Sequence, residues 1–189
     1  MRLNFLHKQN EAGGAVSFLF QPSEPMSWRA GQYMVYNLGH AHPDKRGTKR
    51  YFTIATAPFE KDIRISTRIN DKESSSFKAA LQKLQKGDSI EAEGPKGSFL
   101  IDDPNQESVL IAGGIGIVPF RSILLDLEYR NLPIRATLLY ANKTPEFPYQ
   151  EELGRLEAKY PDFHIHYLVE PERITKEVIR KLVPDLTRP

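Results

Sequence analysis

The alternation of apolar and polar positions predicts that the first half of the chain consists of short β-strands. Six runs with partial alternation are separated by turns rich in glycine, proline, asparagine and aspartate, a spacing typical of a small antiparallel barrel or sandwich. One helix is predicted between the last two of these strands. Apolar residues from Phe77 to Leu84 repeat there at helical spacing, and the serines at 74–76 before them can cap the helix. The predicted strands are Arg2–His7, Ala15–Gln21, Tyr33–Leu38, Tyr51–Thr56, Ile63–Ile69 and Ser89–Glu93.

The second half has a different pattern, in which strands and helices alternate three times. This alternation predicts a parallel α/β sheet. We place the boundary near residue 103, which gives one domain over residues 1–103 and another over 104–189. The predicted strands are Ser108–Ala112, Ile134–Ala141 and Phe163–Val169; the helices are one that carries Phe120, Ile123, Leu124 and Leu127 on one face, then Tyr149–Tyr160 and Thr175–Val183.

Composition removes several classes of function. The 189 residues include no cysteine, which excludes disulfides, cysteine nucleophiles, and zinc or iron–sulfur sites held by thiolates of this chain. The net charge of +2 predicts no nucleic-acid or membrane-surface partner. No apolar run approaches the length of about 20 residues that spans a membrane, and the N-terminus does not resemble a signal peptide. We therefore expect a cytoplasmic protein. We expect no metal site, because the spacing of His40, His42 and Asp44 is typical of a polar loop.

The strongest candidate for chemistry is the glycine-rich turn Ala112–Pro119, between the first strand and the first helix of the second half. Glycines allow the backbone to approach an anion, and the following helix offers unpaired N–H groups. The turn is neither the dinucleotide fingerprint, because Pro119 replaces the third glycine, nor a P-loop. It either binds phosphate, the favoured interpretation, or permits close packing of strand and helix.

Two weaker candidates lie in the first half. Residues Lys49–Thr56 place a permanent cation, an aromatic ring and a hydroxyl along one predicted strand. In a regular strand Arg50, Phe52 and Thr56 share one face, which suits a phosphate beside a stacked ring and equally suits an ordinary barrel strand. The serines at 74–76 suit a pyrophosphate at a helix N-terminus, whereas capping explains one of them well.

The order of five motifs resembles the ferredoxin–NADP reductase superfamily, and most of all its small stand-alone flavin oxidoreductases. The resemblance implies a two-domain fold: an antiparallel six-stranded Greek-key β-barrel with one helix, which holds flavin, then an α/β parallel-sheet domain, which binds a pyridine nucleotide. The motifs are Ala30-Gly31-Gln32-Tyr33, Arg50-x-Phe52-Thr53, the helix at Ser75, Gly94-Pro95-x-Gly97-x-Phe99, and Gly113-Gly114-Ile115-Gly116-Ile117-Val118-Pro119.

The resemblance also implies roles for single residues. Arg50 would bind flavin phosphate, and Phe52 would lie against the isoalloxazine. Thr53 would hydrogen-bond near flavin N5, which makes it the catalytic candidate. The other cofactor-binding candidates are Tyr51; Thr67 and Arg68 beside the ribityl chain; Ser74, Ser75 and Ser76 at the FAD pyrophosphate; and Gly114, Gly116, Ile117, Val118 and Asn142 at the nicotinamide nucleotide.

The function that the resemblance implies is an FAD-dependent oxidoreductase. It would take hydride from NAD(P)H and pass electrons to a separate acceptor, either a protein or a small molecule. The alternatives are a non-catalytic electron-transfer or regulatory flavin subunit of a larger complex, and a plain nucleotide-binding module. The nucleotide stays open, because Lys143 suits a 2′-phosphate and Glu146 suits a ribose diol.

Three features of the sequence depart from the family pattern. Phe52 stands where many members have tyrosine, and Asp71-Lys72-Glu73 stands where the family usually has glycine. FAD is favoured over FMN, but the choice is not settled, because Glu73 beside a pyrophosphate would be repulsive. The family also continues beyond the position of Pro189, so we expect the nucleotide domain to be incomplete at its C-terminal end.

Overall fold

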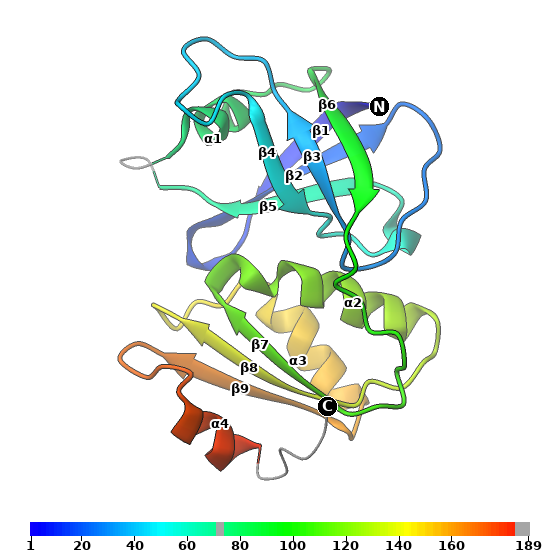
Figure 1. Cartoon of the computed structure of the whole chain (residues 1–189), viewed down its shortest axis with the longest axis vertical. Coiled ribbons are helices and arrows are strands. Elements are labelled where there is room, and N and C mark those ends of the chain that lie inside the picture. Colours follow the sequence, from blue (N-terminus) through cyan, green and yellow to red (C-terminus); the bar gives the residue numbers. More distant parts are fainter. Residues whose placement is uncertain (71–73, 184–189) are drawn as a thin grey trace.

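A computed structural model describes residues 1–70 and 74–183, which form two halves stacked along the long axis of the molecule (Figure 1). The barrel half, residues 1–96, holds a six-stranded antiparallel sheet of order β4-β3-β6-β1-β2-β5 that curls into a half-closed barrel. Its strands are β1 (Arg2–Asn10), β2 (Ala15–Pro22), β3 (Tyr33–Asn37), β4 (Lys49–Thr53), β5 (Ile63–Arg68) and β6 (Ser89–Lys96).

The interior of the barrel half is filled by side chains that alternate along its strands. Phe18, Phe20 and Tyr36 are fully buried there. The helix α1 (Ser76–Gln82) adds Phe77 and Leu81, both fully buried, to the same core. Apolar residues at i and i+4 lie on one face of a helix, and that face is the one that α1 turns towards the sheet.

The strand predicted over Tyr51–Thr56 is wrong by two residues at its start and by three at its end. Residues Tyr51–Thr56 were expected to be extended, whereas β4 covers Lys49–Thr53. Beyond β4 the chain leaves its partner β3: the N–H of Ala55 donates to the carbonyl of Arg64, in β5, at 2.9 Å. Thr56 therefore does not share a strand face with Arg50 and Phe52; it is buried, and its hydroxyl donates to the carbonyl of Asp62 at 2.6 Å.

The α/β half, residues 108–183, confirms the predicted alternation. Its parallel strands are β7 (Ser108–Gly113), β8 (Ala136–Asn142) and β9 (Phe163–Val169), in the order β7-β8-β9. Its helices are α2 (Val118–Tyr129), α3 (Gln150–Lys159) and α4 (Lys176–Leu182), with the short 3-10 turn η3 (Gly114–Ile117) before α2. The predicted apolar face of α2 is buried: Phe120, Ile123, Leu124 and Leu127 are at most 6% exposed.

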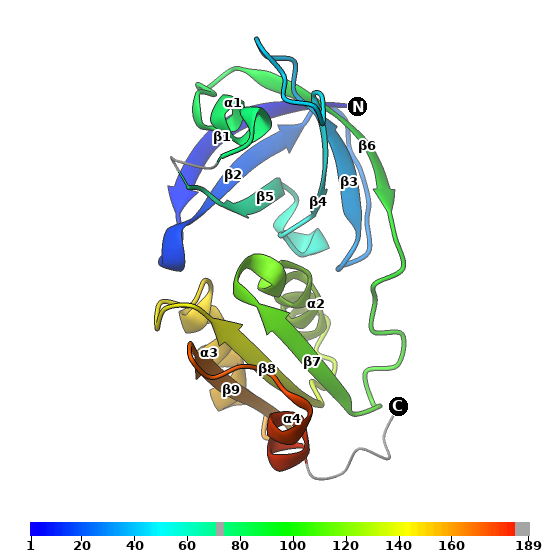
Figure 2. The ribbon, with the colours of Figure 1, turned by 60° about the vertical axis from the view of Figure 1, so that its left-hand side comes forward.

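The helix α2 lies between the barrel half and the sheet of the α/β half (Figures 1 and 2). Residues 97–107 connect the two sheets, and the division of the chain into domains at residue 103 stays a prediction. Within the described residues, no helix combines the length and the apolar character needed to cross a membrane.

Candidate functional site

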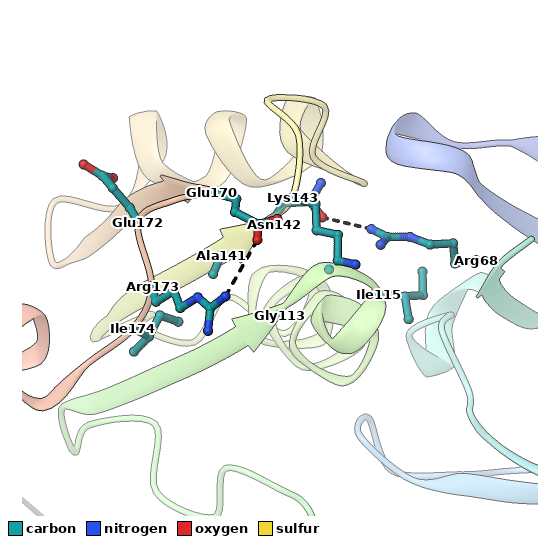
Figure 3. Close-up of a pocket in the computed structure, with 11 residues that line it drawn as sticks. Arg68, Gly113, Ile115, Ala141, Asn142, Lys143, Glu170, Glu172, Arg173 and Ile174 are labelled. Atoms are coloured by element: carbon teal, nitrogen blue, oxygen red, sulfur yellow. Dashed lines mark hydrogen bonds and ion pairs between the residues drawn. The ribbon is translucent and has the colours of Figure 1, made fainter. Parts of the chain in front are cut away.

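A cavity of about 490 Å³ opens at the carboxyl ends of β7 and β8, on the side where the barrel half faces the α/β half (Figure 3). In open parallel sheets, ligands bind in the crevice outside the carboxyl ends of the strands, because loops and helix N-termini converge there. The cavity is lined by Arg68, by residues 113–115 and 141–143, and by Glu170, Glu172, Arg173 and Ile174.

Arg68 reaches this cavity from the barrel half. It is the last residue of β5, and its Nη2 donates to Asn142 Oδ1 at the end of β8, at 2.9 Å (Figure 3). Gly114 has a φ of +50°, and a Cβ added there would stand 3.1 Å from Arg68 Nη2. The missing side chain at Gly114 thus leaves room for the guanidinium. Three predicted residues from distant parts of the sequence therefore meet at one place.

The glycine-rich turn is more open than close packing requires. A Cβ added at Gly113 or Gly116 would meet no atom within 4 Å, so neighbours in the described structure do not demand glycine at either position. Ile117 and Val118, at 0% and 5% exposed, point into the core, which leaves only their backbone for a ligand. The turn is therefore a cradle formed by backbone, with unfilled space above Gly113.

A second predicted residue, Arg50 on β4, is held by a network of hydrogen bonds. Its Nη2 donates to both carboxylate oxygens of Asp44, at 2.9 and 3.1 Å, and its Nη1 donates to nearby backbone carbonyls. Its Nε is buried and has no hydrogen-bond partner among the described residues. A hydrogen bond from the backbone N–H of Arg46, together with the charges of Arg50 and Arg46, holds the pKa of Asp44 well below its usual range.

Positive charge also gathers between β5 and α1. Lys78 on α1 donates through Nζ to the carbonyl of Arg68 at 2.8 Å. Burial lowers the pKa of Lys78, and the positive charges of Arg46 and Arg68 lower it further. A cation whose pKa is depressed in this way lies in surroundings that favour an anion.

Each of the three predicted serines has a hydrogen-bond partner within the protein. Ser75 caps α1 by accepting from Lys78 N at 3.3 Å. Ser74 Oγ accepts from the N–H of Asn70 at 3.2 Å, and Ser76 Oγ accepts from the N–H of Asp44 at 2.9 Å. Capping accounts for one serine, as expected, and the other two fix neighbouring loops. Glu73 and its two neighbours lie outside the described residues.

The remaining predicted residues divide between the two faces of the barrel wall. Phe52 is half-buried and packs against Tyr36 and Phe77, with ring centroids 6.0 and 5.9 Å away. Tyr51 is 70% exposed and lies on the opposite face of β4, so the structure does not bring it to Arg50 and Phe52. Thr53, at the end of β4, is half-buried, and Thr67 is only 4% exposed.

Sequence reasoning missed the segment that follows β9. Glu170, Glu172, Arg173 and Ile174 line the cavity, and Arg173 Nη2 lies 3.8 Å from Glu170 Oε1 (Figure 3). The signal was available, because the predicted third strand ends at Val169 and ligands bind beyond the carboxyl ends of parallel strands. Lys143 also lines the cavity, whereas Glu146 does not.

Comparisons with known proteins match this geometry. Residues 110–187 match the family of oxidoreductase NAD-binding domains. One component of the Na(+)-translocating NADH-quinone reductase of Neisseria meningitidis is 32% identical over 127 residues, which are 62% of this chain and 31% of that protein. Reductase component 1 of terephthalate 1,2-dioxygenase from a Comamonas species is 30% identical over 119 residues, 62% of this chain and 33% of that protein.

The whole chain also matches solved structures. The ferredoxin-NADP+ reductase of Plasmodium falciparum superposes with a TM-score of 0.80 at 19% identity, over 95% of this chain and 77% of that one, which shows a shared fold. The chain spans about a third of the length of the curated relatives that it matches. The sequence match lies in the α/β half and the fold match extends over both halves: residues 110–187 match oxidoreductase NAD-binding domains, and the chain has the fold of ferredoxin-NADP+ reductase.

Proposed function

We propose that the protein is a flavin-dependent oxidoreductase that accepts hydride from NAD(P)H on FAD and passes electrons to a separate protein or small-molecule acceptor. The observation that carries the proposal is the cavity at the carboxyl ends of β7 and β8, where the glycine-rich turn meets Arg68 of the barrel half. A nucleotide bound there would lie between the two halves. The relatives support this function, because their names describe a component of an NADH-quinone reductase and a dioxygenase reductase component.

The residues present fit both cofactors. The buried Arg50 Nε has no partner among the described residues, and the guanidinium lies 5.4 Å from the centre of the Phe77 ring, which packs against the half-buried ring of Phe52. An N–H group in this state favours a ligand acceptor, because leaving it unsatisfied costs about 1–3 kcal/mol. The open space above Gly113 and the buried, unpartnered Arg68 Nε fit the phosphates of a nucleotide in the same way. Arg50 and Phe52 would thus hold flavin, and Arg68 and the turn would hold the nucleotide.

Such a site needs little acid–base chemistry from the protein. Bound flavin supplies the hydride acceptor, and the protein supplies binding, orientation and a dry environment. The turn at Gly113 and Gly114 would fix the nucleotide through backbone N–H groups. Arg68, held by Asn142, would approach the nucleotide from the opposite wall of the cavity. Thr53 at the end of β4 would offer a hydroxyl to the flavin ring.

The visible spectrum of the purified protein, recorded before and after anaerobic NADH, tests this function. We expect a flavin spectrum that bleaches. Gly113→Val should retain flavin and bleach at least about tenfold more slowly at low NADH, because the valine side chain fills the space assigned to the nucleotide; tenfold is about 1.4 kcal/mol of binding free energy. Gly154→Ala, also a glycine with no atom near an added Cβ, is the matched control and should behave as wild type.

The other outcomes of this experiment discriminate between the alternatives. A flavin spectrum that neither NADH nor NADPH bleaches would contradict the proposed reaction and favour a non-catalytic flavin subunit. A colourless protein that also fails to bind added FAD would contradict the flavoprotein assignment altogether.

Replacing Thr53 with valine should keep flavin bound and slow its reduction by NADH by about 2–10-fold. Valine preserves the shape of threonine and removes the hydroxyl, and one hydrogen bond contributes about 0.5–1.5 kcal/mol. Stopped-flow absorbance of flavin reduction measures the rate. Thr137→Val, a change of the same kind on β8, is the control. A reduction rate equal to that of wild type would remove Thr53 from the mechanism.

A further inference from the structure

Two polar side chains at the start of α2 hold the barrel segment that follows β4. Arg121 Nη1 donates to the carbonyl of Ala55 at 2.8 Å, and Ser122 Oγ donates to the carbonyl of Thr56 at 2.7 Å. Both side chains are buried, at 2% and 0% exposed. Trp28 Nε1, from the barrel half, donates to the same Thr56 carbonyl at 3.3 Å. The segment is thus held from both halves of the molecule.

The guanidinium of Arg121 joins three elements. Its Nε donates to Glu152 of α3 at 2.7 Å, and its Nη1 donates to Glu60 of the barrel half at 3.0 Å. Its Nη2 bridges both carboxylates, at 2.8 Å to Glu152 and 3.2 Å to Glu60. Glu60 also accepts from the N–H of Ala57 at 2.7 Å. Every N–H group of the guanidinium therefore has an acceptor.

Stability alone is a poor explanation for this network. Burying the Arg121 cation, at 2% exposed, and partly desolvating Glu60 and Glu152, at 20% and 38% exposed, has a desolvation cost, and well-packed apolar residues in place of such a network are often as stable or more stable. Although burial opposes the charge of Arg121, hydrogen bonds from its N–H groups to Glu152 and Glu60 raise its pKa, so it stays charged. What such a network adds is one defined geometry, because a bidentate guanidinium fixes both direction and distance.

The residues of this network lie close in sequence to both candidate binding segments. Ala55 and Thr56 lie two and three residues after Thr53, at the end of the segment assigned to flavin. Arg121 and Ser122 lie three and four residues after Val118, at the end of the turn assigned to the nucleotide. The two candidate binding segments are therefore joined through few rotatable bonds.

We propose that Arg121 and Ser122 are positioning residues: they form a rigid joint that sets the distance between the flavin segment and the nucleotide turn. The joint keeps the interface between the halves closed during hydride transfer. The expected effect on hydride transfer rests on the proposed function. The rigidity of the joint rests only on the contacts described above. Reacting atoms must lie about 3–3.5 Å apart, and a misplacement of about 1 Å can lower the rate about 100-fold.

The first test compares Arg121→Met with Arg155→Met in the full-length protein. Arg155 also pairs with a glutamate, but its partner Glu128 lies in the same half, so it is a matched control. We expect Arg121→Met to keep flavin and the NADH concentration for half-maximal reduction within about twofold, and to lower the reduction rate at saturating NADH by about 10–100-fold. Arg155→Met should react as wild type. An unchanged saturating rate in Arg121→Met would overturn the inference.

Arg121→Lys is a second variant, which keeps the test decisive if Arg121→Met fails to fold. It retains the positive charge, but an ammonium cannot reproduce the planar fork that holds Ala55 and both carboxylates. We expect a rate between those of wild type and Arg121→Met, with flavin fully retained. A lysine variant as fast as wild type would show that charge, rather than fixed geometry, is what matters, and would contradict the joint.

The second test needs no cofactor. The chain has no cysteine, so spin labels can be attached at Lys86→Cys in the barrel half and Ala158→Cys in the α/β half, both exposed positions. We expect one narrow distance distribution between the labels, which broadens in Arg121→Met and not in Arg155→Met. A distribution that is equally narrow in all three would overturn the rigid joint. If the protein proved to bind no flavin, the proposed function would fail while this measurement would still decide whether the joint exists.

Discussion

Replacing Gly31 with alanine should lower the free energy of unfolding by about 2–5 kcal/mol. Gly31 has a φ of +93°, and a Cβ added there would stand 2.0 Å from the carbonyl oxygen of Phe99 and 3.0 Å from Ile123 Cδ1. The backbone conformation alone costs a non-glycine residue about 1–2 kcal/mol. The overlap adds about 1–3 kcal/mol, because a backbone oxygen between the two sheets cannot move without displacing its neighbours. Urea unfolding measures the loss as a lower midpoint at an unchanged slope.

Gly47→Ala is the matched control for this effect. Gly47 also has a positive φ, +65°, but a Cβ added there meets no atom within 4 Å. It should therefore cost only the conformational part, about 1–2 kcal/mol. The difference between the two variants isolates the close approach of Gly31 to the linker and α2. Equal losses in the two variants would show that this close approach contributes nothing to stability.

The sequence predicted the two kinds of sheet because each follows from a local period. Alternation of apolar and polar residues along β2 and β5 predicts strands of an antiparallel sheet. Helical spacing of apolar residues from Phe120 to Leu127 predicts the buried face of α2. The end of β4 was wrong for a physical reason. Ile54 and Ala55 remain apolar, so the pattern continues, while their N–H groups turn to different partners, Gln32 and Arg64. Apolar periodicity does not report a change of hydrogen-bond partner.

The sequence predicted those parts of the candidate site whose residues lie close together in the chain. The glycine-rich turn and the segment around Arg50 each lie within a few residues of sequence. The link between Arg68 and Asn142 joins residues 74 positions apart, and no local pattern indicates it. The local sequence around Arg121, a cation next to an apolar residue in a helix, predicts a side chain that faces solvent. Its burial depends on Glu60 and Glu152, which other elements bring to it.

Replacing Arg50 with alanine should weaken flavin binding by roughly 10–150-fold, because hydrogen bonds to charged groups contribute about 1.5–3 kcal/mol. Its Nη groups are already bound to Asp44 and to backbone carbonyls, so the buried Nε is the N–H group left for a phosphate. Arg50→Lys, which keeps the charge and lacks that N–H group, should recover only part of the affinity.

Titration of the protein, freed of flavin, with FAD under fluorescence detection measures this effect. Lys49→Ala is the matched control: it removes a neighbouring cation that is 57% exposed and pairs with Glu93, and it should change the affinity less than twofold. Asp44 keeps its contacts with Arg46 and Ser76 when Arg50 is removed, so the loop over α1 should stay folded, and circular dichroism checks that it does. An Arg50→Ala protein that binds FAD as tightly as wild type would remove Arg50 from the flavin site.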